Sequence, residues 1–81
     1  MARVTFSTDL QRYTGGVKHV TVKARSVREL VIELRQRFPA LSDDVIAAYS
    51  LAIDGAIVAR PFLETFNPDS ELVFVARIAA G

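Results

Sequence analysis

The sequence predicts an α+β fold of the β-grasp, or ubiquitin-like, type: one main helix packed across a mixed sheet of four to five strands. Three observations predict it: β-branched segments near both ends of the chain, one apolar stripe of helical period between them, and an Asp-Gly hairpin signal before the last strand. We expect the first and last strands to lie side by side and parallel in the middle of the sheet. The 81 residues, 51% of them hydrophobic, suit a single domain, residues 1–81, with a C-terminal tail at residues 77–81.

The first two strands are predicted at residues 3–6 and 17–22. Residues 3–6 alternate apolar and polar side chains, and residues 17–22 are rich in β-branched side chains. The polar stretch between them contains Gly15-Gly16, which lacks the third spaced glycine and the strand-to-helix turn of a dinucleotide-binding loop. We therefore expect a hairpin-like loop there.

The main helix is predicted over about residues 27–37. Ser26 and Glu29 form a capping box, in which the Ser26 hydroxyl accepts from the Glu29 N–H and the Glu29 carboxylate accepts from the Ser26 N–H. Pro39 disfavours helical geometry at Phe38, so the helix should end near Arg37. The apolar stripe consists of Val27, Leu30, Val31, Leu34 and Phe38. Arginines and glutamates are interleaved along this segment, which favours a solvated helix surface over a phosphate-binding patch.

Turn signals organise the second half of the chain. Asp54-Gly55 lies between short apolar segments and predicts a type I′ hairpin. Residues 67–70 suit a type I turn, with Pro68 at its second position. The closing strand, residues 71–76, is apolar on both faces, which is typical of a central strand covered by a helix on one side.

Alternation along the strands predicts which side chains face the helix. If Leu72 and Phe74 point inward, Val73 and Val75 point outward, where they have no core to fill. We therefore predict a partner interface at Val73 and Val75. The expected core consists of Val4, Phe6, Val20, Val22, Leu30, Leu34, Leu72 and Phe74.

Composition excludes several classes of function. A formal net charge of +1 does not supply the field of a dedicated nucleic-acid binder. There is no cysteine, so disulfides, thiolate metal sites and cysteine nucleophiles are excluded. The chain opens without a leader, and no apolar run approaches 18 residues, so we expect a cytoplasmic protein that neither inserts into membranes nor binds nucleic acid.

Few side chains are candidates for chemistry. His19 is the only histidine, and we interpret it as an exposed structural residue because one imidazole cannot form a metal site or triad unaided. Asp43-Asp44 lacks the spaced oxygen ligands of a calcium loop and is expected to cap a short helix at residues 45–48. Phe62 and Phe66 are interpreted as core residues. No catalytic residue, metal site or cofactor is predicted.

The C-terminal carboxylate remains as a candidate reactive group. Arg77, Ile78, Ala79 and Ala80 lead from the last strand to Gly81, forming a slim tail that could enter a narrow active site on another protein. A frayed terminus is the alternative interpretation. A carboxylate on Gly81 would become reactive toward a sulfur donor after adenylation, and small residues would limit clashes in a narrow passage.

The sequence resembles the MoaD/ThiS family of ubiquitin-like sulfur carriers, especially the small subunit of molybdopterin synthase, over almost its whole length. Residues 26–30 (Ser-Val-Arg-Glu-Leu) and 37–41 (Arg-Phe-Pro-Ala-Leu) are similar to the family phrases Thr-Val-Arg-Glu-Leu and Arg-Tyr-Pro-x-Leu. The Asp54-Gly55 hairpin and residues 69–81 match the family in register. Ala80 stands where the family usually has glycine, and Arg77 where proline is usual.

The resemblance implies a role without catalysis by this chain. In the family, the terminal glycine, here Gly81, is adenylated by a ubiquitin-activating-like enzyme and converted to a thiocarboxylate. It then delivers sulfur to a precursor held by the molybdopterin synthase large subunit or another acceptor enzyme. The helix phrases favour molybdopterin over thiamine synthesis. Two alternatives stay open: a non-carrier β-grasp interaction module with a vestigial tail, and a ubiquitin-like modifier conjugated through Gly81.

Overall fold

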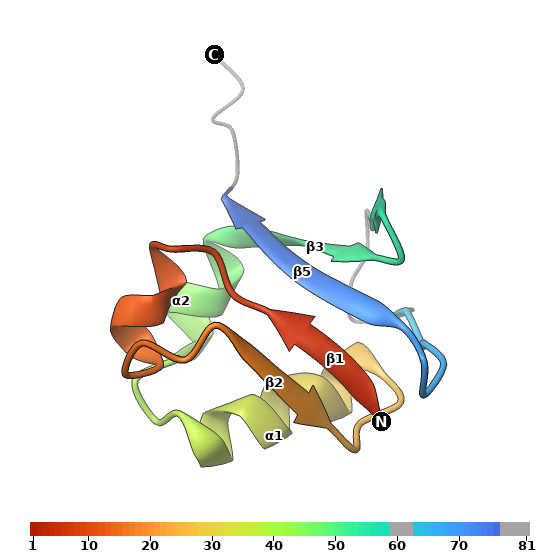
Figure 1. The fold of residues 1–81 in the computed structure, drawn as a ribbon, viewed down its shortest axis with the longest axis horizontal. Coiled ribbons are helices and arrows are strands. Elements are labelled where there is room, and N and C mark those ends of the chain that lie inside the picture. The colour runs from red at the N-terminus through yellow and green to blue at the C-terminus, as the bar shows by residue number, and fades with distance from the viewer. Residues whose placement is uncertain (59–62, 77–81) are drawn as a thin grey trace.

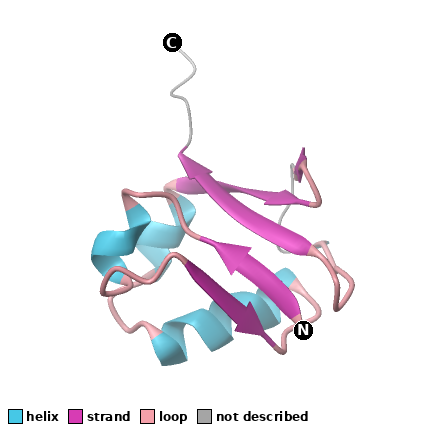
Figure 2. Cartoon of the chain, viewed as in Figure 1, coloured by secondary structure: helices cyan, strands magenta, loops and turns pink. Residues whose placement is uncertain are grey.

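The computed structural model describes residues 1–58 and 63–76 and shows helices covering one face of a mixed sheet (Figures 1 and 2). The strand order is β2-β1-β5-β3-β4, with β1 and β5 parallel at the centre and the other neighbours antiparallel. The predicted β-grasp arrangement is therefore confirmed. In chain order the elements are β1 (Ala2–Thr5), the 3-10 helix η1 (Leu10–Tyr13), β2 (His19–Val22), α1 (Val27–Arg37), α2 (Asp43–Ala47), β3 (Tyr49–Ile53), β4 (Ala56–Ile57) and β5 (Glu71–Ala76).

The connection between β1 and β2 contains η1, which the sequence did not predict. Its single buried residue is Leu10, an isolated apolar side chain that leaves no periodic signal in the sequence. Gly16 closes the connection by donating its N–H to the Gln11 carbonyl at 2.8 Å, with φ of +87°. Glycine adopts this left-handed conformation without steric cost.

Helix α1 begins and ends where the sequence predicted. The Ser26 hydroxyl accepts from the Glu29 N–H at 3.2 Å, as expected of a cap. The Glu29 carboxylate, however, accepts from the Arg25 N–H at 2.9 Å, one residue before the predicted Ser26 N–H. Tertiary pairing explains the difference from the prediction. Residues 25–27 pair with residues 64–66 around an isolated β-bridge, and this pairing sets the orientation of the N–H groups before the helix.

The N-cap of α2 also differs from the predicted one. Ser42, in extended conformation, accepts from the Val45 N–H, and the helix begins at Asp43 rather than after Asp44. Both aspartates therefore lie in the first turn, where the helix dipole favours negative charge. A hydroxyl at the N-cap satisfies a free N–H as well as a carboxylate does, which is why the sequence was ambiguous here.

Both predicted turns around β5 are present. Asp54 and Gly55 have φ of +50° and +87°, as a type I′ hairpin requires, and they place Ala52 opposite Ile57. In the second turn the Ser70 N–H donates to the Asn67 carbonyl at 3.0 Å. Strand β5 follows at the predicted bounds, between β1 and β3.

The core lies between α1 and the sheet and centres on Phe6. The Phe6 ring meets Phe38 edge to face at 5.7 Å and stacks on Phe74 at 6.3 Å between centroids. All predicted core residues are buried except Val20, which is half-buried and packs against the cluster from the edge strand. None of the helices within residues 1–58 and 63–76 has the length and apolar character that a membrane span requires.

Candidate functional site

The outer face of the sheet, the side turned away from α1, carries the predicted interface residues. Leu72 and Phe74 of β5 are buried toward α1, whereas Val73 and Val75 point the other way and stay half-exposed. Strand alternation explains the difference, because consecutive side chains of a strand point to opposite faces. The structure therefore places both valines where the sequence predicted, on a surface that no described element covers.

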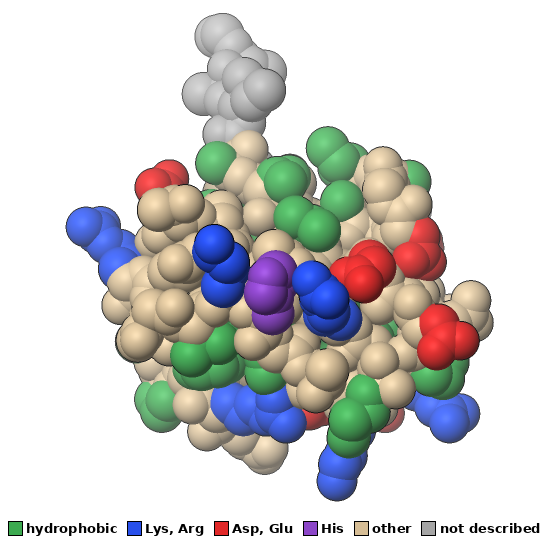
Figure 3. Space-filling view, in the orientation of Figure 1, with side chains coloured by type: hydrophobic (Ala, Val, Ile, Leu, Met, Phe, Trp, Pro, Cys, Tyr) green, Lys and Arg blue, Asp and Glu red, His purple; other side chains and the backbone are tan. Residues whose placement is uncertain are grey.

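Strand register assembles these valines with two more apolar residues. Val73 lies opposite Ala52 of β3, and Ala52 lies opposite Ile57 of β4. Ile57 is 66% exposed, whereas Ala52, between its two neighbours, is buried. We define Ala52, Ile57, Val73 and Val75 as the apolar patch. Figure 3 shows hydrophobic side chains gathered on this face beside the histidine. Ala52 and Ile57 were not predicted at this surface, although the Asp54-Gly55 hairpin implies their pairing.

The rest of the outer face is polar. Thr5 of β1 lies opposite Val73 on one side and opposite His19 of β2 on the other. Its hydroxyl is 3.0 Å from His19 Nδ1, in a hydrogen bond at the surface. Arg3 and Glu71 form an exposed ion pair at 3.8 Å. His19 is therefore exposed, as predicted, and its one described partner is a hydroxyl, which cannot serve as the carboxylate of a catalytic triad.

The patch adjoins the end of β5 from which the chain continues to its terminus. Ala76, the last residue of β5, lies opposite Tyr49 at the start of β3. The predicted tail residues Arg77, Ile78, Ala79 and Ala80 and the predicted reactive residue Gly81 lie outside the described residues. Five extended residues span at most about 18 Å. A partner that acts on Gly81 would therefore have to bring its active site within about that distance of Ala76.

A polar hollow lies beside the same end of β5. It is lined by Thr8, Asp9, Arg12, Tyr13 and Tyr49. These residues come from η1, the segment preceding it and the start of β3, so no contiguous sequence motif predicts the hollow. Two phenols, a hydroxyl, a carboxylate and a guanidinium can exchange hydrogen bonds with a polar surface, which extends the possible contact area beyond the apolar patch.

The other candidate residues that the structure describes make contacts that stabilise the fold. Asp43 pairs with Arg35 at 3.2 Å, and no group of three histidine, cysteine or acidic side chains within residues 1–58 and 63–76 could hold a metal ion. Phe66 is 9% exposed and belongs to the core, as predicted, whereas Phe62 lies outside the described residues. The candidate site is therefore the outer face of the sheet beside Ala76, the last described residue of β5.

Comparison with known proteins identifies the fold. No protein-family model matches the chain, and no curated protein matches it in sequence. Among solved structures, the BexX/CysO complex of Amycolatopsis orientalis contains a chain with a TM-score of 0.82 and 18% identity over 100% of both chains. SAMP1 (small archaeal modifier protein 1) from Haloferax volcanii has a TM-score of 0.74 and 20% identity, over 99% of this chain and 98% of its own.

A third similar structure is the complex of subunits 1 and 2 of molybdopterin-converting factor from Helicobacter pylori. Its matched chain has a TM-score of 0.72 and 12% identity, over 99% of this chain and 97% of its own. What these proteins share with the present chain is the ubiquitin-like β-grasp fold. The expectation of fold drawn from the sequence resemblance is thereby confirmed.

Proposed function

We propose that this protein is a sulfur carrier that bears a thiocarboxylate on Gly81 and supplies sulfur to molybdopterin synthesis. The observation that carries the proposal is the apolar patch on the outer face of a ubiquitin-like fold, with Ile57 exposed and Val73 and Val75 half-exposed, near the end of β5. Ala76, at that end, is five residues from Gly81. A partner can grip the patch while the tail reaches its active site. The chain supplies the carrier group, and its partners supply catalysis, in the cytoplasm.

The chemistry takes two steps. In the first, the Gly81 carboxylate attacks the α-phosphate of ATP on a ubiquitin-activating-like enzyme, forming an acyl adenylate and releasing pyrophosphate. In the second, a sulfur donor at the oxidation level of sulfide attacks the acyl carbon, the bond to the adenylate oxygen breaks, and AMP leaves. The product is a terminal thiocarboxylate, whose ionised sulfur is the nucleophile for transfer.

The described residues fit this division of labour. Strand β5 pairs with β1 over residues 71–73 and with β3 over residues 72–76, so pairing with β3 fixes the position of Ala76, from which the tail continues. The apolar patch offers a partner apolar surface to cover, and burying such surface contributes roughly 25 cal/mol per Å². Ala79, Ala80 and Gly81 keep the final residues narrow.

Two similar structures bear on the pathway. One is a complex of both subunits of molybdopterin-converting factor, which supports a large-subunit partner for this chain. The other is SAMP1, described as a modifier protein, which supports the second candidate function: conjugation of Gly81 to lysines of other proteins. Both functions need the same activated carboxylate, so they differ in the acceptor. The helix phrases at residues 26–30 and 37–41 place molybdopterin synthesis first.

The experiment is reconstitution with the cognate adenylating enzyme, ATP and a sulfur donor. Intact-mass spectrometry should show a gain of about 16 Da, because one sulfur atom replaces one oxygen atom of the Gly81 carboxylate. The loaded protein should then support molybdopterin formation by the large subunit. Transfer of the intact chain to lysines, with no sulfur delivered, would favour the modifier. A chain that is never adenylated would leave the non-carrier interaction module as the better interpretation.

A further inference from the structure

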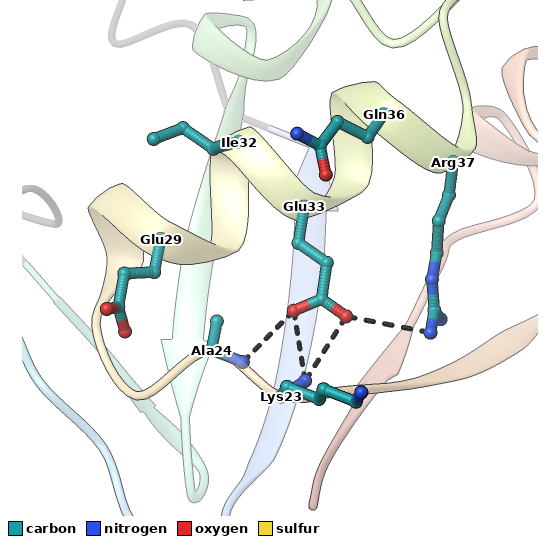
Figure 4. Close-up of a pocket in the computed structure, with 7 residues that line it drawn as sticks. All are labelled: Lys23, Ala24, Glu29, Ile32, Glu33, Gln36 and Arg37. Atoms are coloured by element: carbon teal, nitrogen blue, oxygen red, sulfur yellow. Dashed lines mark hydrogen bonds and ion pairs between the residues drawn. The ribbon is translucent and has the colours of Figure 1, made fainter.

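Two hollows of the surface differ in what their polar side chains bind. Along α1, the Glu33 carboxylate accepts from the Lys23 N–H at 3.0 and 3.2 Å and from the Ala24 N–H at 3.0 Å. Arg37 donates to the Thr21 carbonyl at 2.7 Å and lies 3.6 Å from the Glu33 carboxylate. Figure 4 shows Glu33 pointing from the helix to the two amides, with Arg37 beside it. Both side chains bind backbone groups, which corrects their interpretation as solvated charges and leaves neither free to bind a ligand.

The polar hollow beside the end of β5 is the opposite case. It has a volume of about 450 Å³ and is lined by Thr8, Asp9, Arg12, Tyr13 and Tyr49. Asp9 precedes η1, but its side chain makes no capping hydrogen bond. Within residues 1–58 and 63–76, no hydrogen bond or ion pair engages any of the five lining side chains. The hollow therefore presents a carboxylate, a guanidinium and three hydroxyl groups whose hydrogen-bonding capacity the described residues leave unused.

Strand topology places the polar hollow next to Ala76, from which the tail continues. Strands β1 and β5 are parallel, so the segments that follow them leave the same end of the sheet (Figure 1). Residues 8–13 belong to the segment that follows β1. Tyr49 begins the antiparallel strand β3 at that end and lies directly opposite Ala76. The tail therefore starts beside a residue that lines the hollow.

The lining residues combine a fixed wall with two opposite charges. The Tyr13 and Tyr49 side chains are half-buried and pack against the core, which restrains their rings at the wall of the hollow. Asp9 and Arg12 are exposed and three residues apart, and residues at this spacing lie on the same side of a 3-10 turn. They form no ion pair with each other. One negative and one positive group thus stand ready for a ligand that carries both charges.

We propose that the polar hollow binds the C-terminal tail of this chain, with the Gly81 carboxylate on the Arg12 guanidinium and the Arg77 guanidinium on the Asp9 carboxylate. The inference rests on the proposed function, because it takes Gly81 as the free terminus. It adds a resting site for the tail. A docked carboxylate is not available for adenylation, so the tail must leave the hollow before it enters the active site of a partner.

Length and charge favour the tail over a separate molecule as the occupant. Five extended residues reach at most about 18 Å from Ala76, which is enough to fold back onto a hollow that begins at the neighbouring strand. The tail carries one cation, Arg77, and one anion, the Gly81 carboxylate, so its charges match those of Asp9 and Arg12. A ligand on so short a linker has a millimolar effective concentration, at which contacts as weak as exposed ion pairs become populated.

Digestion of the full chain by a carboxypeptidase measures how often the tail is free. Arg12→Gln removes the positive group from the hollow. Arg25→Gln makes the same charge change at the other end of the sheet, because Arg25 is exposed and follows β2, which runs antiparallel to β1. Release of Gly81 should be about threefold faster from Arg12→Gln than from wild type, the ratio that exposed ion pairs provide, and unchanged in Arg25→Gln.

Salt supplies a second control. At an ionic strength of about 1 M the Debye length is about 3 Å, so wild type and Arg12→Gln should be digested equally fast. Equal rates of wild type and Arg12→Gln already at low salt would overturn the proposal.

Nuclear magnetic resonance of the wild-type protein tests the contact directly, even if Arg12→Gln does not fold. Nuclear Overhauser effects should connect protons of residues 78–81 with the rings of Tyr13 and Tyr49, and Arg12→Gln should lose them. Their absence from the wild type would show that the tail does not occupy the hollow. Tail contacts that persist unchanged in Arg12→Gln would show that the guanidinium does not hold the carboxylate.

The mass of the protein after incubation with the adenylating enzyme, ATP and a sulfur donor tests the proposed function separately. Thiocarboxylate formation without tail contacts would overturn this inference alone, whereas tail contacts without thiocarboxylate formation would overturn the proposed function alone. If Arg12→Gln left the tail unchanged but weakened binding of the adenylating enzyme, the hollow would bind that partner and not the tail.

Discussion

The carboxylate of Asp54 accepts a hydrogen bond from the hydroxyl of Ser70 at 3.0 Å, linking the β3–β4 turn to the start of β5. The same carboxylate accepts from the Glu71 N–H at 2.9 Å, and the Asp54 N–H donates to the Glu71 carbonyl at 2.8 Å. Ser70 is buried, and its hydroxyl also accepts from the Asn67 N–H at 3.0 Å, so its hydrogen bonds are made within the protein. The turn residue thus serves two purposes: it adopts positive φ, and it positions the strand that leads to the terminus.

The Asp54–Ser70 hydrogen bond should contribute measurably to the free energy of unfolding. Asp54→Gly keeps the positive φ accessible but removes both side-chain hydrogen bonds, so the free energy of unfolding should fall by about 1–3 kcal/mol. Ser70→Ala should cost about 1 kcal/mol. Urea denaturation of both variants checks this, with Asp69→Ala at the exposed neighbouring position as a control expected within about 0.5 kcal/mol of wild type. An Asp54→Gly variant as stable as wild type would contradict the prediction.

Alanine substitutions should lower the free energy of unfolding more at buried positions than at an exposed position of the same helix. Leu34 is fully buried and Phe74 is 4% exposed, so replacing either with alanine should lower the free energy of unfolding by about 2–5 kcal/mol. Ile32, 60% exposed on the same helix, should tolerate alanine within about 0.5 kcal/mol. Equilibrium denaturation measures all three. Equal effects at Leu34 and Ile32 would show that the helix packs on a different side.

Partner binding should depend on the apolar patch. Val73→Asp places a charge at its centre while leaving the core untouched, so we expect the Kd for the cognate large subunit to rise at least about tenfold. Calorimetric titration gives the affinity, and circular dichroism checks the fold. Ile32→Asp puts the same charge on an exposed apolar position of α1 and should bind like wild type. If the two variants bind equally well, the patch is not the interface.

Activation should depend on the last two residues. Deleting Gly81 should abolish thiocarboxylate formation, because the chain would then end in Ala80. Ala80→Gly should preserve or accelerate it by removing one methyl group from the passage into the adenylating enzyme. Intact-mass spectrometry over a time course measures both effects. Modification of Ala80→Gly but never of wild type would favour a non-carrier protein with a vestigial tail.

The sequence by itself determined those parts of the protein for which the signal is local. The bounds of α1 follow from Ser26 at its start and Pro39 after its end, and the Asp54-Gly55 turn follows from its need for positive φ. Alternation along β5 was enough to send Val73 and Val75 to the outer face. Each of these inferences needs only a few neighbouring residues, because capping, turn geometry and side-chain period act within one element.

The tertiary structure alone decided what depends on contacts between distant segments. Pairing of residues 25–27 with residues 64–66 gave Glu29 the Arg25 N–H in place of Ser26. Register across three strands joined Ile57 and Ala52 to Val73, and packing of α1 against β2 turned Glu33 and Arg37 from surface charges into hydrogen-bond partners of the backbone. The physical reason is that a side chain's partner is set by strand register and helix position, and these emerge only when the whole core packs.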